Sequence, residues 1–273
     1  MSYTYKLILL IFLFVFFIVP VSCLANNFTG MWWDESKPGT GVFLGFTEGS
    51  NGVCGSWYLY DERGAPQWLT FIGTVENNKL QATLYSFTGP AFGQPWDNTQ
   101  VRGEAVGNID LDFSNSDFIA MNYEVQRQTG SLHLTRFSSK SCAGSLWWDI
   151  SKQGQGIAHF HFPGPSGQEL PSLVWYVYDS NGNSIWYTAT SNSDTSTYDV
   201  WKFSGPPLGE NWDPELVKSE KVGTINVDFE QAFIQDMGKP VDSINIDMRF
   251  SVDGINGNLS LRPFVCPVAV PER

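Results

Sequence analysis

The sequence predicts an all-β protein that contains two copies of one domain. Three observations support this fold class: the chain repeats itself, apolar residues alternate along short segments, and turn-forming residues separate those segments. GMWWDESKPGTGVF at Gly30 is matched by GSLWWDISKQGQGI at Gly144, which places Trp32 and Trp147 115 residues apart. A repeat of this length corresponds to a whole domain, because solenoid repeats run about 20–50 residues.

The two copies agree in the same order along the chain. The further matched segments are WYLYDERGAPQW from Trp57 with WYVYDSNGNSIW from Trp175, FTGPAFGQPWD from Phe87 with FSGPPLGENWD from Phe203, and VGNIDLDF from Val106 with VGTINVDF from Val222. The spacing between matched positions stays between 115 and 118 residues, so insertions are small and confined to turns. We therefore expect copy one at 26–140 and copy two at 141–273.

Residues 1–25 have the pattern of a cleavable signal peptide. Lys6 precedes the apolar run LILLIFLFVFFIV, and the segment ends in VSCLA at Ala25. The run is too short for a spanning helix with a stop-transfer flank, so no transmembrane span is expected in the mature chain. In an alternative interpretation Cys23 carries a lipid anchor, although Pro20 replaces the aliphatic residue usual there. Both interpretations predict export to the periplasm, the cell surface or the medium.

Apolar residues occupy every second position in the segments between turns, as in Val42, Leu44 and Phe46. This period is typical of short antiparallel strands with one buried face. The expected strands of copy one are 31–34, 41–48, 53–60, 66–76, 79–87, 101–113, 117–126 and 130–137. Those of copy two are 146–149, 156–162, 172–179, 184–190, 197–203, 217–229, 243–252 and 256–262.

About eight strands per copy suit a meander that forms a closed barrel or a two-sheet sandwich. Closure would remove the exposed edges of such aromatic strands. In a meander, every other turn lies at the same end, so SKPGTG, DERGA and TGPAFGQPWD should gather at one mouth of copy one. SKQGQG, DSNGNS and SGPPLGENWD should gather at the corresponding mouth of copy two.

Composition limits the partners. The formal net charge is −12 and the pI is near 4.6, which argues against nucleic acid and anionic lipid surfaces as partners. Aromatic residues make up 15% of the chain, too many for a disordered protein. Nothing in the sequence indicates a cofactor.

Three cysteines remain after removal of the leader: Cys54, Cys142 and Cys266. The meander places Cys54 and Cys142 at the same end of copy one, and copy two has Ser172 where copy one has Cys54. We expect a Cys54–Cys142 disulfide, with Cys142–Cys266 as the alternative, because export permits disulfides.

The motifs GxWW with SxxGxG, then WYxYDxxGxxxW, then TGPxxGxxWD, together resemble a tandem-domain family of secreted bacterial proteins whose function is uncharacterised. The resemblance covers nearly all of 30–264 and implies the duplicated domain, without an activity. The opening strand and meander are also loosely similar to avidins and lipocalins, an analogy of architecture alone.

Adjacent residues of a strand face opposite ways, so Trp32 and Trp33 cannot both be core residues, and the same holds for Trp147 and Trp148. An aromatic face next to polar groups is typical of sugar-stacking or apolar-ligand sites, and barrel mouths are common places for ligands. The candidate ligand-binding residues are Trp33, Asp61, Trp68, Trp96, Trp148, Asp179, Trp186 and Trp212. The alternative is that these aromatic residues fill the cores and the seam between the copies.

Two candidate metal sites are not favoured. His159 and His161 share one strand face and could begin a zinc or copper site with Asp149 or Glu169, but the ligand set is incomplete. Asp179, Asn181 and Asn183 have the spacing of a small calcium loop, although an Asn-Gly hairpin turn explains them without an ion.

No nucleophile–base motif appears in the chain, and there are only three histidines. Paired carboxylates, such as Asp34 with Asp61 or Asp149 with Asp179, leave a hydrolase as a further alternative. The sequence therefore favours an exported binding protein for a carbohydrate or small apolar ligand over an enzyme. A structural or adhesive envelope protein, whose aromatics pack domains or meet a protein partner, is the main alternative. Because copy two differs at the histidines and at DSNGN, we expect unequal sites.

Overall fold

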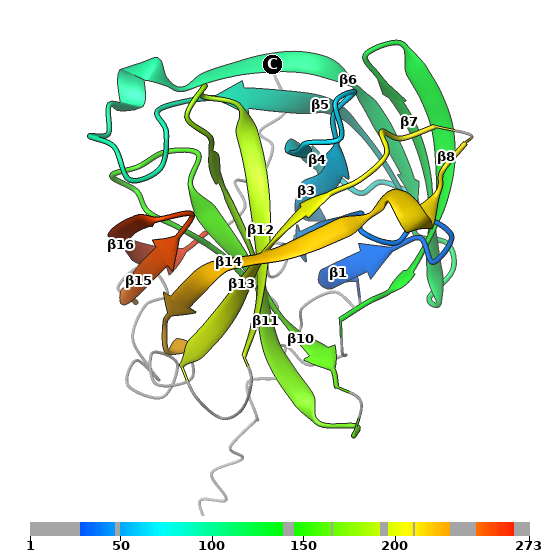
Figure 1. Ribbon diagram of the computed structural model, residues 1–273. Coiled ribbons are helices and arrows are strands. Elements are labelled where there is room, and N and C mark those ends of the chain that lie inside the picture. Colours follow the sequence, from blue (N-terminus) through cyan, green and yellow to red (C-terminus); the bar gives the residue numbers. More distant parts are fainter. Residues whose placement is uncertain are drawn as a thin grey trace, which may run out of the picture.

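The computed structural model describes residues 28–46, 50–138, 145–164, 166–191, 196–209, 211–229 and 244–264 (Figure 1). The predicted signal peptide lies outside the described residues, as do Cys23, Cys142 and Cys266. Neither of the two predicted disulfide pairings can therefore be followed in the structure.

The described residues form sixteen strands and two short 3₁₀ segments. The first eight strands are β1 (Gly30–Trp33), β2 (Gly41–Phe46), β3 (Gly52–Tyr60), β4 (Pro66–Thr74), β5 (Lys79–Thr88), β6 (Arg102–Asp112), β7 (Phe118–Val125) and β8 (Gln128–Arg136). The second eight are β9 (Ser145–Trp148), β10 (Gly156–Pro163), β11 (Glu169–Tyr178), β12 (Ser184–Ser191), β13 (Thr197–Ser204), β14 (Lys218–Asn226), β15 (Ile246–Val252) and β16 (Ile255–Pro263). The segments η1 (Asn98–Gln100) and η2 (Pro214–Leu216) precede β6 and β14.

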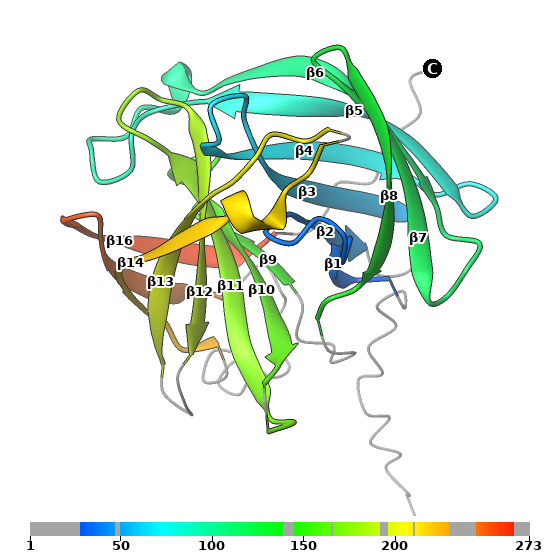
Figure 2. The same ribbon diagram turned by 45° about the vertical axis from the view of Figure 1, so that its right-hand side comes forward.

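Each set of eight strands forms an antiparallel meander that closes on itself. In barrel 1, β1 pairs with both β2 and β8. In barrel 2, β9 pairs with both β10 and β16. The all-β prediction and the two eight-stranded antiparallel sheets are confirmed, and the sheets form barrels rather than sandwiches. Figure 2 shows the two barrels side by side.

Alternation along the strands divides the apolar residues between two environments. On β3, Trp57 and Leu59 point into the core of barrel 1, whereas Tyr58 and Tyr60 belong to a second buried cluster between the barrels. The equivalent strand β11 behaves in the same way, with Trp175 in the core of barrel 2. These strands are apolar on both faces because both faces are covered.

The connection that follows β5 crosses over to barrel 2. Phe92 is 4% exposed and belongs to the core of barrel 2, where its ring lies 5.3 Å from that of Trp175 and 6.0 Å from that of Tyr187. In the reverse direction, the connection that follows β13 places Leu208, 5% exposed, in the core of barrel 1. Each barrel is thus completed by a side chain from the other half of the chain.

Backbone hydrogen bonds hold these two crossing loops in place. The N–H of Gly89 donates to the carbonyl of Gly182 over 3.1 Å, and the N–H of Gly205 donates to the carbonyl of Gly64 over 3.2 Å. Gly64 and Gly182 have φ values of 77° and 80°, a region that L-residues adopt at a cost. A Cβ on Gly205 would lie 2.4 Å from the Tyr60 ring, so glycine is required there by the close approach of the other barrel.

Among the described residues, no helix is long and apolar enough to cross a bilayer.

The exchange of loops predicts that Phe92→Ala destabilises barrel 2, although Phe92 belongs to the first half of the chain. Truncation of a buried phenylalanine costs about 3–5 kcal/mol. Hydrogen exchange followed by mass spectrometry should show faster exchange in β11, β12 and β15 than in β5 and β6.

Leu208→Ala is the matched variant, since Leu208 fills barrel 1. Its faster exchange should appear in barrel 1. If hydrogen exchange became faster only in barrel 1 for Phe92→Ala and only in barrel 2 for Leu208→Ala, the crossing of these side chains between the barrels would be contradicted.

Candidate functional site

The most aromatic part of the molecule is the seam between the barrels, defined here by the buried cluster to which both barrels contribute. Its buried members are Met31, Phe43, Cys54, Tyr58, Tyr60 and Trp68 from barrel 1, and Leu146, Ala158, Phe160, Val174, Tyr178 and Trp186 from barrel 2. They are outward-facing residues of their strands, so each barrel presents an apolar outer face to the other.

Trp68 and Trp186, two of the predicted ligand residues, anchor the seam. Trp68 is 2% exposed and its indole N–H donates to the carbonyl of Val177 over 3.1 Å. Trp186 is 3% exposed and its N–H donates to the carbonyl of Leu59 over 3.1 Å. Each tryptophan therefore crosses to the other barrel and satisfies its polar atom there, which makes both residues structural parts of the seam.

Trp96 and Trp212 extend the seam from the two crossing loops. The ring of Trp96 stacks on Tyr178 at 6.0 Å, and the ring of Trp212 stacks on Tyr60 at 6.2 Å. The Trp96 N–H donates to the side chain of Asn98. In copy two the residue that corresponds to Asn98 is Pro214, which offers no side-chain acceptor, and the Trp212 N–H has no partner. The two halves thus share their geometry and differ in their polar contacts.

Trp33 and Trp148 remain half-buried, while their neighbours Trp32 and Trp147 are fully buried, as strand alternation predicts. Each half-buried tryptophan lines a groove between the barrels. The Trp33 groove has a volume of about 280 Å³ and includes Trp186 in its wall. The Trp148 groove has a volume of about 310 Å³ and includes Trp68.

The two grooves occupy matching places in the two halves. Phe137 packs edge-on against Trp33 at 5.1 Å, and Phe264 packs edge-on against Trp148 at 5.4 Å. The accessible walls are mostly carbon, and neither groove has a charged side chain in its lining. The structure therefore brings four predicted residues together in pairs, Trp33 with Trp186 and Trp148 with Trp68, in grooves between the barrels rather than inside a barrel mouth.

Two polar groups in these walls were not recognised from sequence. Gln155 is 2% exposed, lines the Trp148 groove, and its side-chain oxygen has no hydrogen-bond partner. Tyr58 is 3% exposed and lines the Trp33 groove, where its hydroxyl makes no hydrogen bond of ordinary geometry. The sequence signal for Gln155 was that it replaces Thr40 between two glycines that both copies share.

The seam tyrosines are uncharged over the physiological pH range. Burial, followed by the nearby Tyr176, raises the pKa of Tyr58 well above its ordinary value, and the neighbouring Ser56 lowers it slightly. Burial also raises the pKa of Tyr176, whose hydroxyl donates to the carbonyl of Trp147. A neutral, low-dielectric surface of this kind suits an uncharged ligand.

Asp61 and Asp179 lie outside both grooves and organise turns. Asp61 accepts hydrogen bonds from the N–H groups of Arg63 and Ala65, and Asp179 accepts them from Asn181 and Asn183. Burial raises the pKa of Asp61, but these hydrogen bonds and the Arg63 charge outweigh it and lower the pKa overall. Because the Asn183 amide donates to the remaining Asp179 oxygen, the predicted calcium spacing is explained by the hairpin turn alone.

Asp34 and Asp149 tie the first strand of each barrel to the last. Asp34 accepts hydrogen bonds from the N–H and hydroxyl of Ser36 and, across the barrel closure, from the N–H of His133 on β8. Asp149 likewise accepts hydrogen bonds from the N–H and hydroxyl of Ser151 and from the N–H of Ser260 on β16. These repeated carboxylates therefore support barrel closure.

His159 and His161 lie together on β10, with ring centroids 5.3 Å apart, and His159 stacks on Phe229 at 4.1 Å. Among the described residues, no three His, Cys, Asp or Glu side chains converge as a metal site would require. His159 is buried and packs on Phe229 of the barrel 2 core, and His161 lies beside it.

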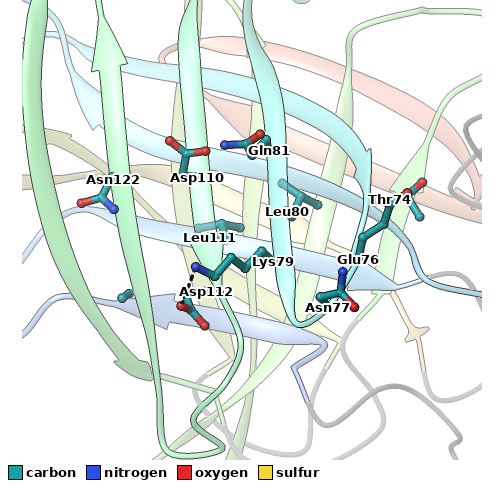
Figure 3. A pocket seen from close by; sticks show the side chains of 11 residues that line it. Thr74, Glu76, Asn77, Lys79, Leu80, Gln81, Asp110, Leu111, Asp112 and Asn122 are labelled. Carbon is teal, nitrogen blue, oxygen red and sulfur yellow. Dashed lines mark ion pairs between the residues drawn. The ribbon is translucent and has the colours of Figure 1, made fainter.

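A further hollow lies elsewhere, on the outside of barrel 1 beside the turn between β4 and β5 (Figure 3). It has a volume of about 770 Å³, and the side chains of Gln81, Asp110 and Asn122 follow one another across its wall. An exposed ion pair joins Lys79 to Asp112 over 3.8 Å. The lining of this hollow contains no aromatic side chain and none of the predicted site residues, so the hollow lacks a stacking surface.

No family model, curated protein or solved structure matches this chain.

The Asp34 contacts predict that Asp34→Asn lowers the free energy of unfolding by about 1–2 kcal/mol at pH 7, because the amide cannot accept all of these bonds. Urea denaturation measures the difference. Asp110→Asn, on the exposed outer face, removes the same charge and should change stability by less than about 0.5 kcal/mol.

The difference between wild type and Asp34→Asn should shrink in acid. Burial raises the pKa of Asp34, but hydrogen bonds from Ser36 and His133 and the charge of Lys37 lower it overall. A lowered pKa contributes stability that is fully present above the unfolded value of about 3.9 and is lost as the pH falls through the folded value. A difference that stays constant from pH 7 to pH 3 would contradict this role.

Proposed function

We propose that the protein is a non-enzymatic binding protein for a small, neutral, apolar ligand, which it holds in the Trp33 and Trp148 grooves. The observation that carries the proposal is the repetition of one groove design in both halves, a half-buried tryptophan facing a buried one. Ligand pockets are concave and mostly apolar with few polar groups, and their volumes begin near 300 Å³. Grooves of about 280 and 310 Å³ therefore suit a small ligand.

The chemistry of the walls favours an apolar ligand over a carbohydrate. A sugar presents several hydroxyl groups, and each one buried without a partner costs free energy. The accessible surface of both grooves is mainly aromatic and aliphatic carbon. A charged ligand is disfavoured because neither lining has a counter-ion.

A structural role is the second candidate, and the crossed loops favour it. Phe92 and Leu208 fill the opposite barrels, and Trp68 and Trp186 are buried with their N–H groups satisfied across the seam. In this alternative, the aromatics serve only to join the barrels into a rigid unit for an envelope structure or a protein partner.

We further propose that the chain is exported, with residues 1–25 removed, and that it belongs with the secreted tandem-domain proteins that its motifs resemble. Export into an oxidising compartment would allow Cys54 to pair with Cys142. N-terminal sequencing of the protein recovered from the envelope or medium tests the processing site. Growth with a labelled fatty acid, followed by mass spectrometry of the protein, tests lipidation at Cys23.

Titration with the neutral fluorophore N-phenyl-1-naphthylamine tests ligand binding. We expect saturable binding at two sites per chain, and a Kd about tenfold higher at one site in Trp33→Ala and at the other in Trp148→Ala. Loss of the aromatic face removes about 1.4 kcal/mol or more of apolar contact.

The matched control is Trp201→Ala, which removes an exposed tryptophan of β13 that lines neither groove. It should leave probe binding unchanged. No saturable binding, combined with lower stability of Trp33→Ala and Trp148→Ala, would reject the binding function and support the structural role.

A further inference from the structure

We infer that the Trp148 groove selects neutral apolar ligands that carry a hydroxyl group, with Gln155 as the residue that recognises the hydroxyl. This inference rests on the proposed binding of apolar ligands in the grooves and specifies the ligand class of one of them.

The side-chain oxygen of Gln155 is buried and has no hydrogen-bond partner. An unpaired amide in an apolar wall costs free energy, because it gives up its hydrogen bonds to water on folding. The Tyr176 hydroxyl, which belongs to a residue lining the same groove, donates to the carbonyl of Trp147. A ligand in the groove that donates a hydrogen bond would remove this cost.

A hydroxyl meets the requirement of this site better than other polar groups. It donates to the amide oxygen, the atom of Gln155 that has no partner, whereas an ether cannot. An ammonium or carboxylate group would be desolvated in a groove without a charged side chain. The bulk of the ligand must be apolar, because Trp68, Phe71 and Phe264 form much of the wall.

The Trp33 groove differs at the corresponding position. Thr40 stands where copy two has Gln155, and its hydroxyl donates to the carbonyl of Lys37 over 2.9 Å. The Tyr58 hydroxyl in this groove can donate to an alcohol or to an ether alike. Only the Trp148 groove therefore discriminates in favour of a hydrogen-bond donor.

The experiment compares octan-1-ol with its isomer 1-methoxyheptane, which has the same composition and no hydroxyl. Both displace N-phenyl-1-naphthylamine from the Trp33→Ala variant, in which the Trp148 groove is intact. We expect octan-1-ol to displace the probe at about tenfold lower concentration than the ether, because the ether leaves the Gln155 oxygen without a hydrogen bond.

Gln155→Met keeps the length of the side chain and removes the amide. In Trp33→Ala/Gln155→Met, the ratio of the 1-methoxyheptane and octan-1-ol concentrations that displace half of the probe should fall from about ten to about one. Gln155→Thr, which copies the residue of the Trp33 groove, should also lose the preference, and it serves as the second variant if the methionine variant fails to fold.

The outcomes separate this inference from the proposed function. Failure of the fluorophore to bind the wild-type protein rejects groove binding altogether. Normal fluorophore binding with equal displacement by the two isomers in Trp33→Ala, or a preference for the alcohol that survives in both Gln155 variants, overturns the role of Gln155 and leaves groove binding intact.

Discussion

Two loops cross between the barrels, and the positions of the candidate site residues depend on that crossing. Phe92 leaves barrel 1 to complete the core of barrel 2, and Leu208 does the reverse. Because neither core is complete without the other half of the chain, the outer faces of β3, β4, β11 and β12 are held together. The aromatic seam, and the two grooves at its sides, follow from that enforced contact.

The exchange also explains which motifs the two copies share most closely. The turn with Gly64 accepts a backbone hydrogen bond from the loop with Gly205, and the turn with Gly182 accepts one from the loop with Gly89. The YDxxG turn and the GP loop are therefore partners across the seam, each from a different copy. A bulky residue at one of these glycines would displace the other barrel, so the constraint acts on both motifs together.

Strand positions could be predicted from sequence because alternation reports directly on the two faces of a strand. The expected strand at 53–60 corresponds to Gly52–Tyr60, and the one expected at 217–229 ends earlier, at Asn226. Alternation does not report what covers the outer face, so Trp68 could be assigned to that face but not to the seam. The crossing of Phe92 was also hidden, because a loop has no periodicity. The one sequence feature that accompanies the crossing is an apolar residue followed by glycine at matching places in both loops, Phe92 and Leu208.

The difference between the grooves is the part of the structure that packing does not explain. The indole N–H groups of Trp68 and Trp186 have partners across the seam, whereas the hydroxyl groups of Tyr58, Tyr60 and Tyr178 make no hydrogen bond of ordinary geometry. The side-chain oxygen of Gln155 is also unpaired, although an apolar side chain of the same length would fill its place without an unpaired amide. Thr40 shows that the backbone there accepts a residue that satisfies its own hydroxyl locally. Neither packing nor backbone geometry demands glutamine at this point, and the hydrogen-bonding ligand proposed for the Trp148 groove would give its amide a partner.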